Sequence, residues 1–210
     1  MKIPRISLLV FTILGWAATS VQAETIRIVA FGDSGVYGSG RSSSTGMSGG
    51  VPVSQAFPAR IEQKLRARGW DVAVSNQGVS GDRASTALSR VDSAVPRGTH
   101  LTLVMLGGND LRAGASFEEV GANMRKIGAA ILGKGSRLMI IRTRQPPTSQ
   151  PNPYLVLWAA GLWDTRGMPA PPYDSGDREH LNVAGNDVIA ERAVPDIERV
   201  LRELGFKQKK

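Results

Sequence analysis

In LTLVMLGGND, residues 101–110, an almost wholly apolar run ends in two glycines and an Asn-Asp pair. A continuous apolar run, without the alternation of a half-exposed strand, is typical of a strand buried on both faces of a sheet. Similar runs lie at residues 26–31 (IRIVAF), 71–76 (DVAVSN) and 136–143 (SRLMIIRT). Buried strands of this kind predict a parallel sheet covered by helices on both faces.

Helical patterns separate these strands. They cover residues 58–68, which Gly69 ends, residues 83–95, residues 116–135, where Ser116 and Glu119 form a capping-box pattern, and residues 183–204. YLVLWAAGLW, residues 154–163, fits a short helix or a strand, and residues 32–53 are expected to form a long Gly/Ser-rich loop. The alternation predicts a three-layer α/β/α sandwich around a central parallel sheet of about five strands, as in flavodoxin-like folds.

The first 23 residues have the composition of an export signal. Lys2 and Arg5 precede a mostly apolar stretch at residues 6–18, and small residues follow up to Ala23. The apolar stretch is shorter than the about 20 residues that a membrane-spanning helix needs, although an uncleaved anchor stays an alternative. We expect a signal peptide at residues 1–23 and a single domain at residues 24–210, exported to the periplasm or secreted and not inserted in the membrane.

Composition excludes several classes of chemistry. The chain has no cysteine and only two histidines, so neither a thiolate site nor a histidine-rich metal site is expected. The net charge is +8, but no periodic basic helix and no interleaving of basic and aromatic residues indicates binding to nucleic acid. Composition therefore indicates neither a thiolate or histidine-rich metal site nor a nucleic-acid-binding surface.

Three polar groups follow the predicted strands and their loops. Ser34 ends the triplet Gly-Asp-Ser after the first strand, Asn109 follows the strand at residues 101–106, and Asp177 precedes His180 by three residues. Each is an ordinary turn pattern when taken alone. Together they supply a nucleophile, a base oriented by an acid on one helix-like turn, and an amide donor for an oxyanion, which is the set that acyl transfer requires.

These residues, in this order, resemble the SGNH hydrolase superfamily, also called the GDSL esterase/lipase family. FGDSGVYGSG matches its first block, SNQGVSGDRA its second, LGGND its third and DREHLN its last. The sequence is most similar to the periplasmic thioesterase I/lysophospholipase L1 type. The resemblance covers essentially the whole chain after residue 23.

The resemblance implies a catalytic triad of Ser34, Asp177 and His180. It also implies an oxyanion hole formed by the backbone N–H groups of Ser34 and Gly81 and by the side chain of Asn109. The expected reaction is hydrolysis of a small-molecule acyl ester or thioester, lipid-derived substrates included, through an acyl-enzyme on Ser34 and without cofactor or metal.

The chain departs from the family pattern in three places. Gly35 stands where members usually carry leucine, which predicts a looser backbone beside the nucleophile. The loop at residues 32–53 is longer than in the subgroup, and the segment at residues 146–176 is shorter, which leaves the wall of the acyl pocket undetermined. Trp158 and Trp163 are candidates to line that pocket, although packing alone also accounts for them.

Two other functions compete with this interpretation. A carbohydrate O-acetylesterase would use the same fold and the same residues, and a non-catalytic domain that binds glycan or lipid would need only the fold. Nucleotide binding is not expected, because Gly38-Ser39-Gly40 is followed by Ser43 where a third glycine is required.

Overall fold

The computed structural model describes residues 24–41, 48–142, 155–164 and 166–209, so the predicted signal peptide lies outside the described residues. Its main sheet has five strands in the order β4-β1-β5-β6-β7, and each neighbouring pair is parallel. The strands are β1 (Ile26–Gly32), β4 (Val72–Gly78), β5 (Leu101–Met105), β6 (Arg137–Arg142) and β7 (Leu155–Trp158). Among the described residues, no helix combines the length and the apolar character that crossing a membrane requires.

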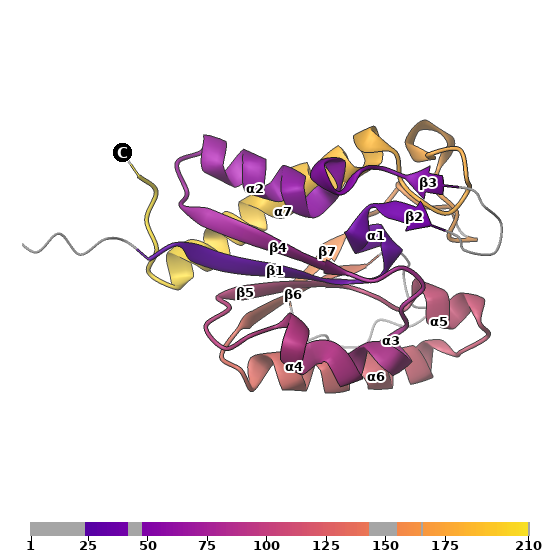
Figure 1. Ribbon diagram of the computed structural model, residues 1–210, viewed down its shortest axis with the longest axis horizontal. Coiled ribbons are helices and arrows are strands. Elements are labelled where there is room, and N and C mark those ends of the chain that lie inside the picture. Colours follow the sequence, from indigo (N-terminus) through magenta and orange to yellow (C-terminus); the bar gives the residue numbers. More distant parts are fainter. Residues whose placement is uncertain (1–23, 42–47, 143–154, 165, 210) are drawn as a thin grey trace, which may run out of the picture.

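Helices cover both faces of this sheet (Figure 1). One layer contains α2 (Phe57–Ala67) and α7 (Val183–Glu203), and the other contains α3 (Ala84–Ala87), α4 (Val91–Ala94) and α6 (Phe117–Leu132). The predicted three-layer α/β/α sandwich is confirmed.

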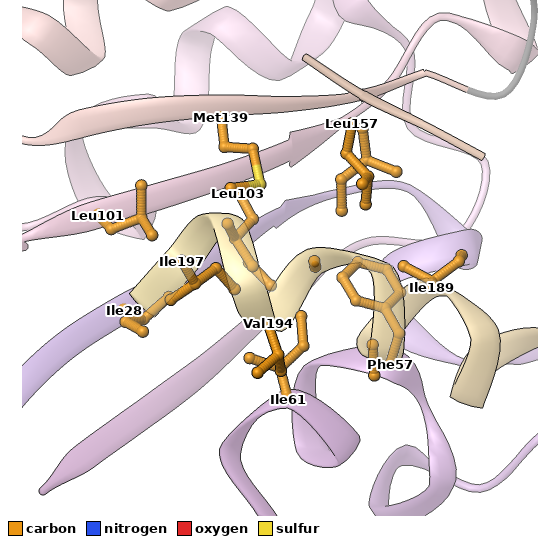
Figure 2. Packing of buried hydrophobic residues seen from close by; sticks show 14 of the residues in the cluster. Ile28, Phe57, Ile61, Leu101, Leu103, Met139, Leu157, Ile189, Val194 and Ile197 are labelled. Atoms are coloured by element: carbon orange, nitrogen blue, oxygen red, sulfur yellow. The ribbon is translucent and has the colours of Figure 1, made fainter. Parts of the chain in front are cut away.

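The core consists of two apolar layers, one on each side of the sheet. Successive residues of a strand point to opposite faces, so in β1 Ile28 packs toward α2 and α7 while Val29 and Phe31 pack toward α3, α4 and α6. Figure 2 shows the first layer, where Phe57 and Ile61 of α2 meet side chains of α7 and of the strands. Every strand residue of β5 is buried, as the apolar run at residues 101–106 predicts.

Two helix boundaries follow the sequence signals. Ser116 caps α6, and its hydroxyl accepts from the Glu119 backbone N–H while the Glu119 carboxylate accepts from that of Ser116, which confirms the capping box. Gly69 has a φ of 84° and ends α2. The helix predicted at residues 83–95 is wrong in its continuity, because the 3-10 turn η2 (Leu88–Arg90) separates α3 from α4.

The composition of this segment explains the break. The hydroxyl of Ser89 donates to the Thr86 carbonyl and that of Ser93 donates to the Arg90 carbonyl. Side chains that bond to nearby backbone groups compete with helical hydrogen bonding, so a segment rich in serine and threonine is a poor continuous helix.

The predicted loop at residues 32–53 contains regular structure. A four-residue helix, α1 (Ser34–Tyr37), follows β1, and β2 (Ser39–Arg41) pairs with β3 (Ser48–Gly50) in an antiparallel hairpin before the 3-10 turn η1 (Val53–Gln55). The segment at residues 154–163, for which a helix or a strand fits, contributes the edge strand β7.

The strand order creates a switch point between β1 and β5. These strands are neighbours, with Gly32 paired to Met105, but the chain leaves them for opposite sides of the sheet. In open α/β sheets, ligands bind beyond the carboxyl ends of the strands at such a point. The helix α1 after β1, the helix α5 (Gly108–Arg112) after β5 and the hairpin β2–β3 gather at this end of the molecule (Figure 1).

Candidate functional site

Ser34 is the first residue of α1 and is held at the end of β1 by its neighbours. A Cβ on Gly32 would overlap the Met105 carbonyl and the Val36 side chain, so only glycine allows β1 to turn this close to β5. The Asp33 carboxylate caps α1 by accepting from the Gly35 N–H at 2.9 Å. Ser34 is therefore fixed at the switch point, with only 8 % of its surface exposed.

His180 lies between Ser34 and Asp177. Its Nε2 is 2.8 Å from the Ser34 Oγ, and its Nδ1 is 2.6 Å from Asp177 Oδ2. A bond from Nδ1–H to the carboxylate fixes the tautomer that leaves Nε2 free to accept a proton from the serine. The structure thus brings together three residues that the sequence places at the two ends of the domain.

The turn that carries Asp177 and His180 is not the helix-like turn expected from their spacing. Arg178 has a φ of 62°, and Asp174 pairs with Leu181 across the turn. The Asp177 carboxylate organises this backbone, since its Oδ1 accepts from the N–H groups of Glu179 and His180 at 2.9 and 2.8 Å. The two side chains still meet because the carboxylate holds both the His180 ring and the His180 backbone.

The contacts of Asp177 set its charge state. Burial alone would raise the pKa of this carboxyl, but the hydrogen bonds from the His180 ring and from the two backbone N–H groups outweigh burial and lower the pKa to about 2. Asp177 is therefore ionised around neutral pH, and its Oδ2 accepts a hydrogen bond from His180 Nδ1–H.

Asn109 lies on α5, beside the end of β5, and both ends of its amide have partners. Its Nδ2 donates to the Asp82 carbonyl at 2.7 Å, and its Oδ1 accepts from the Arg112 guanidinium at 2.7 Å. If the amide were rotated by 180°, Nδ2 would face the Arg112 guanidinium, which is also a donor, and Oδ1 would face the Asp82 carbonyl, which is also an acceptor. Arg112 and the Asp82 carbonyl therefore fix which way the second Nδ2 proton points.

Gly81 lies on the loop after β4, next to the residue whose carbonyl binds Asn109. It has a φ of 80°, and a Cβ there would meet no atom within 4 Å, so the loop needs glycine for its left-handed backbone and not for space. The Asp110 carboxylate accepts from the Ala84 and Ser85 N–H groups at 2.7 and 3.2 Å. These bonds join the Gly81 loop to α5.

Arg90, which the sequence did not single out, binds the loop after β4 that carries Gly81 and Asp82. Its guanidinium donates to Asp82 Oδ2 at 2.6 Å, to the Gln77 carbonyl at 2.9 Å and to the Gly32 carbonyl at 2.7 Å. The guanidinium also lies 4.1 Å from the centre of the Phe31 ring. Nothing in the local sequence marks this arginine, because its partners come from the ends of two different strands.

A pocket opens beside Ser34 and His180. Arg112, Trp163 and Glu179 line it together with Met105 and Gly35. Arg112 and Glu179 form an ion pair at 3.2 Å, so the pocket has polar as well as apolar walls. Of the two tryptophan candidates, Trp163 lines the pocket, whereas the side chain of Trp158 lies outside the described part of the structure.

The pocket also shows how the chain accommodates glycine at position 35. A Cβ on Gly35 would overlap the terminal methyl of Met105, so Met105 fills the space that a side chain at this position would occupy. Gly35 is held as part of α1 through its N–H bond to Asp33. The expectation of a looser backbone beside Ser34 finds no support in these contacts.

Asp33 is the second unusual carboxyl of the site. Burial raises its pKa to about 6, and the Gly35 N–H and the positive charge of Arg112 only partly offset this effect. The group lies in the wall of the pocket next to Ser34. Because its pKa is about 6 and that of Asp177 is about 2, Asp33 changes charge in a pH range where Asp177 stays ionised.

The chain matches the model of the GDSL-like lipase/acylhydrolase family over residues 30–203, which include every residue of the site described above. The chain belongs to this family.

One relative of known name matches about half of the sequence. The chain is 25 % identical over 103 residues to the esterase TesA of Pseudomonas aeruginosa, a match that covers 49 % of the chain and 51 % of TesA. The chain thus spans about half the length of the curated relative it matches.

Two solved structures resemble the fold. A carbohydrate acetylesterase from Sinorhizobium meliloti matches with a TM-score of 0.65 at 14 % identity, covering 83 % of this chain and 99 % of the acetylesterase. The aryl esterase of M. smegmatis matches with a TM-score of 0.63 at 15 % identity, covering 84 % of this chain and all of that esterase. At these identities the likeness concerns the fold alone.

Proposed function

We propose that the protein is a serine esterase that hydrolyses carboxylic esters or thioesters through an acyl-enzyme on Ser34. The observation that carries this proposal is the hydrogen-bonded series from Asp177 through His180 to Ser34, with contacts of 2.6 and 2.8 Å. A domain that only binds glycan or lipid has no need of a serine, an imidazole and an ionised carboxylate in this geometry.

In the first half of the reaction, Ser34 Oγ attacks the carbonyl carbon while its proton passes to His180 Nε2. The imidazolium is stabilised by Asp177, which keeps Nδ1–H as a donor and stays ionised. Collapse of the tetrahedral intermediate expels the alcohol or thiol, which takes the proton from Nε2. The acyl group is left as an ester of Ser34.

In the second half, water replaces the alcohol. His180 Nε2 takes a proton from the water, the resulting hydroxide adds to the acyl carbon, and the proton returns to Ser34 Oγ as the acid leaves. No metal or cofactor takes part in these steps. The carbonyl oxygen becomes negative in both tetrahedral intermediates and needs donors at both stages.

The backbone N–H groups of Ser34 and Gly81 and the free Nδ2 proton of Asn109 are the donors that we propose for this oxygen. The fixed orientation of the Asn109 amide supports its part in this set, because Arg112 and the Asp82 carbonyl hold the other polar atoms of the amide. Loss of one such donor costs on the order of 3 kcal/mol in the transition state.

We also propose a substrate class and a location for the protein. The pocket beside Ser34 is lined by apolar and charged side chains, which fits a small acyl group with a polar leaving group as well as a lipid-derived ester or thioester. The signal-like composition of residues 1–23 supports export to the periplasm or beyond.

The test is hydrolysis of p-nitrophenyl esters from acetyl to palmitoyl, alongside acetylated xylan, by the wild type and by Ser34→Ala. We expect turnover of the soluble esters by the wild type, and none by Ser34→Ala at an unchanged thermal midpoint. Equal turnover by the variant overturns the proposal. A strong preference for acetyl groups on xylan would assign the protein to the carbohydrate O-acetylesterases instead.

A further inference from the structure

The hairpin β2–β3 lies directly against the Asp177 carboxylate. A Cβ on Gly49 would overlap Asp177 Oδ2, the oxygen that accepts from His180, and would come within 2.6 Å of the Asp177 Cβ. The Asp177 side chain is only 13 % exposed. The backbone of the hairpin therefore covers the acid of the triad with no side chain between them.

Gly49 is needed for this contact and not for its own backbone conformation. The neighbouring Gly50 has a φ of 85°, which favours glycine, but Gly49 is not among the residues with positive φ. An L-residue at position 49 would keep the backbone of β3 and would still collide with Asp177. The small residue is thus explained by Asp177 alone.

Ser175 makes a second connection between the hairpin and Asp177. The Gly50 N–H donates to Ser175 Oγ at 2.9 Å, and Ser175 Oγ donates to Asp177 Oδ1 at 3.0 Å. Because the hydroxyl accepts from the backbone of β3, its single proton is directed to the carboxylate. Oδ1 is then saturated by Ser175 and by two backbone N–H groups, which leaves Oδ2 to His180.

The same segment of chain also carries the nucleophile. Gly38 follows α1 directly, and its N–H donates to the Ser34 carbonyl at 2.8 Å, while its carbonyl accepts from the Val51 N–H at 2.8 Å. The described residues 34–41 therefore begin at the serine, and residues 48–50 lie against the acid. The hairpin is thus bonded to the backbone that carries Ser34 and packs against Asp177.

We propose that the hairpin β2–β3, through the close contact of Gly49 and the hydroxyl of Ser175, positions Asp177 for His180 and excludes water from their hydrogen bond. The proposal rests on the proposed function. It makes Gly49 and Ser175 positioning residues, which act through Asp177 and do not touch the reacting atoms. Desolvation of this hydrogen bond strengthens it, since an ionic interaction is worth more where water is absent.

Gly49→Ala is the direct test, and Gly121→Ala is its matched control. Gly121 lies in the middle of α6, where the nearest atom to an added Cβ is the end of the Arg125 side chain at 3.4 Å. Displacement of the acid by about 1 Å is expected to lower kcat by about 100-fold with little change in KM, whereas Gly121→Ala keeps the wild-type kcat. Equal kcat in the two variants would overturn the proposal.

The proton resonance of His180 Nδ1–H gives a readout that does not depend on turnover. A short bond from Nδ1–H to a carboxylate shifts this proton far downfield in an NMR spectrum. We expect the shifted signal in the wild type and in Gly121→Ala, and its loss in Gly49→Ala. A wild type that shows the signal but hydrolyses no ester would contradict the proposed function and leave the hairpin proposal to be judged by the signal.

Ser175→Ala and Ser175→Thr test the second connection and do not depend on Gly49→Ala folding. Removal of the hydroxyl takes a donor from a charged acceptor, so kcat is expected to fall about ten-fold in Ser175→Ala, with KM and the thermal midpoint close to wild type. Ser175→Thr keeps the hydroxyl and restores most of the loss. Full activity in Ser175→Ala, or no recovery in Ser175→Thr, would show that the hydroxyl does not position Asp177.

Discussion

Met105 and residue 35 compete for the same space, since the terminal methyl of Met105 lies where any side chain on residue 35 would begin. The two residues end β5 and follow β1, and both line the pocket beside Ser34. Glycine at position 35 and methionine at position 105 therefore form a matched pair, and we expect them to shape the pocket together.

Gly35→Leu is predicted to reduce activity, and Met105→Ala in the same chain to restore it. The single variant overpacks a site in which Met105 is 5 % exposed, so kcat/KM for a short p-nitrophenyl ester should fall about ten-fold or more. The double variant removes the competing side chain and should recover most of this loss. If the double variant loses as much activity as Gly35→Leu and Met105→Ala lose separately, added together, then the two side chains do not compete for one space.

Arg112→Ala is predicted to lower kcat by about ten-fold. The substitution removes the donor that fixes Asn109 Oδ1 and lets the amide turn its oxygen toward the oxyanion. Arg199→Ala is the control, because that arginine lies on α7 and bonds only to carboxylates of its own helix among the described residues. A larger KM at unchanged kcat in Arg112→Ala would indicate that the guanidinium binds substrate instead.

Asp33→Asn is predicted to stabilise the protein at neutral pH and not at acidic pH. The pKa of Asp33 is raised from 3.8 to about 6, so the folded state holds its proton more tightly than the unfolded state. The protein is therefore most stable, with respect to Asp33, below pH 4, where this carboxyl is protonated in both states. This stability is lost as the pH rises through 6 and the buried carboxyl ionises. Asparagine keeps the acceptor for the Gly35 N–H without the charge.

The free energy of unfolding of both proteins, measured by denaturant between pH 4 and 8, tests this prediction. The difference in favour of the asparagine variant should grow by up to about 3 kcal/mol between pH 4 and 7 and then stay constant. A difference that is independent of pH would show that burial does not perturb Asp33.

Arg90→Ala is predicted to destabilise the fold by about 3 kcal/mol, because the buried carboxylate of Asp82 loses its guanidinium partner. Asp82→Asn in the same chain removes the unpaired charge and should recover part of the loss. Thermal and denaturant unfolding of the two single variants and the double variant give the coupling free energy. A coupling near zero would mean that Arg90 acts only through the carbonyls it binds and the Phe31 ring.

Most of the fold could be predicted from the apolar runs of the strands. Residues 101–106 and 26–31 predict buried strands because both faces of a central parallel strand are covered, and the capping box at Ser116 marks a helix start by purely local chemistry. The hairpin β2–β3 could not be predicted, since its Gly and Ser residues lack an apolar pattern and its contact with Asp177 joins segments that are distant in the sequence.

The site likewise contains residues that local sequence patterns indicate and residues that they do not. Ser34, Asn109, Asp177 and His180 lie beside local turn signals, and their combination and order along the chain single them out. Ser34 and Asn109 come together because β1 and β5 are neighbours, with Gly32 paired to Met105. The supporting residues have no local signal. Met105, Arg90 and Ser175 gain their roles from partners that are distant in the sequence, and only the folded chain shows them.

Covalent labelling of Ser34 is a direct test that His180 activates this serine as a nucleophile. A fluorophosphonate reacts with a serine that an adjacent base activates, and mass spectrometry of the digested protein locates the adduct. We expect a single adduct on Ser34 in the wild type, none in Ser34→Ala, and labelling slowed by orders of magnitude in His180→Ala. An unlabelled wild type, or labelling of Ser34 at the same rate without His180, would contradict this activation.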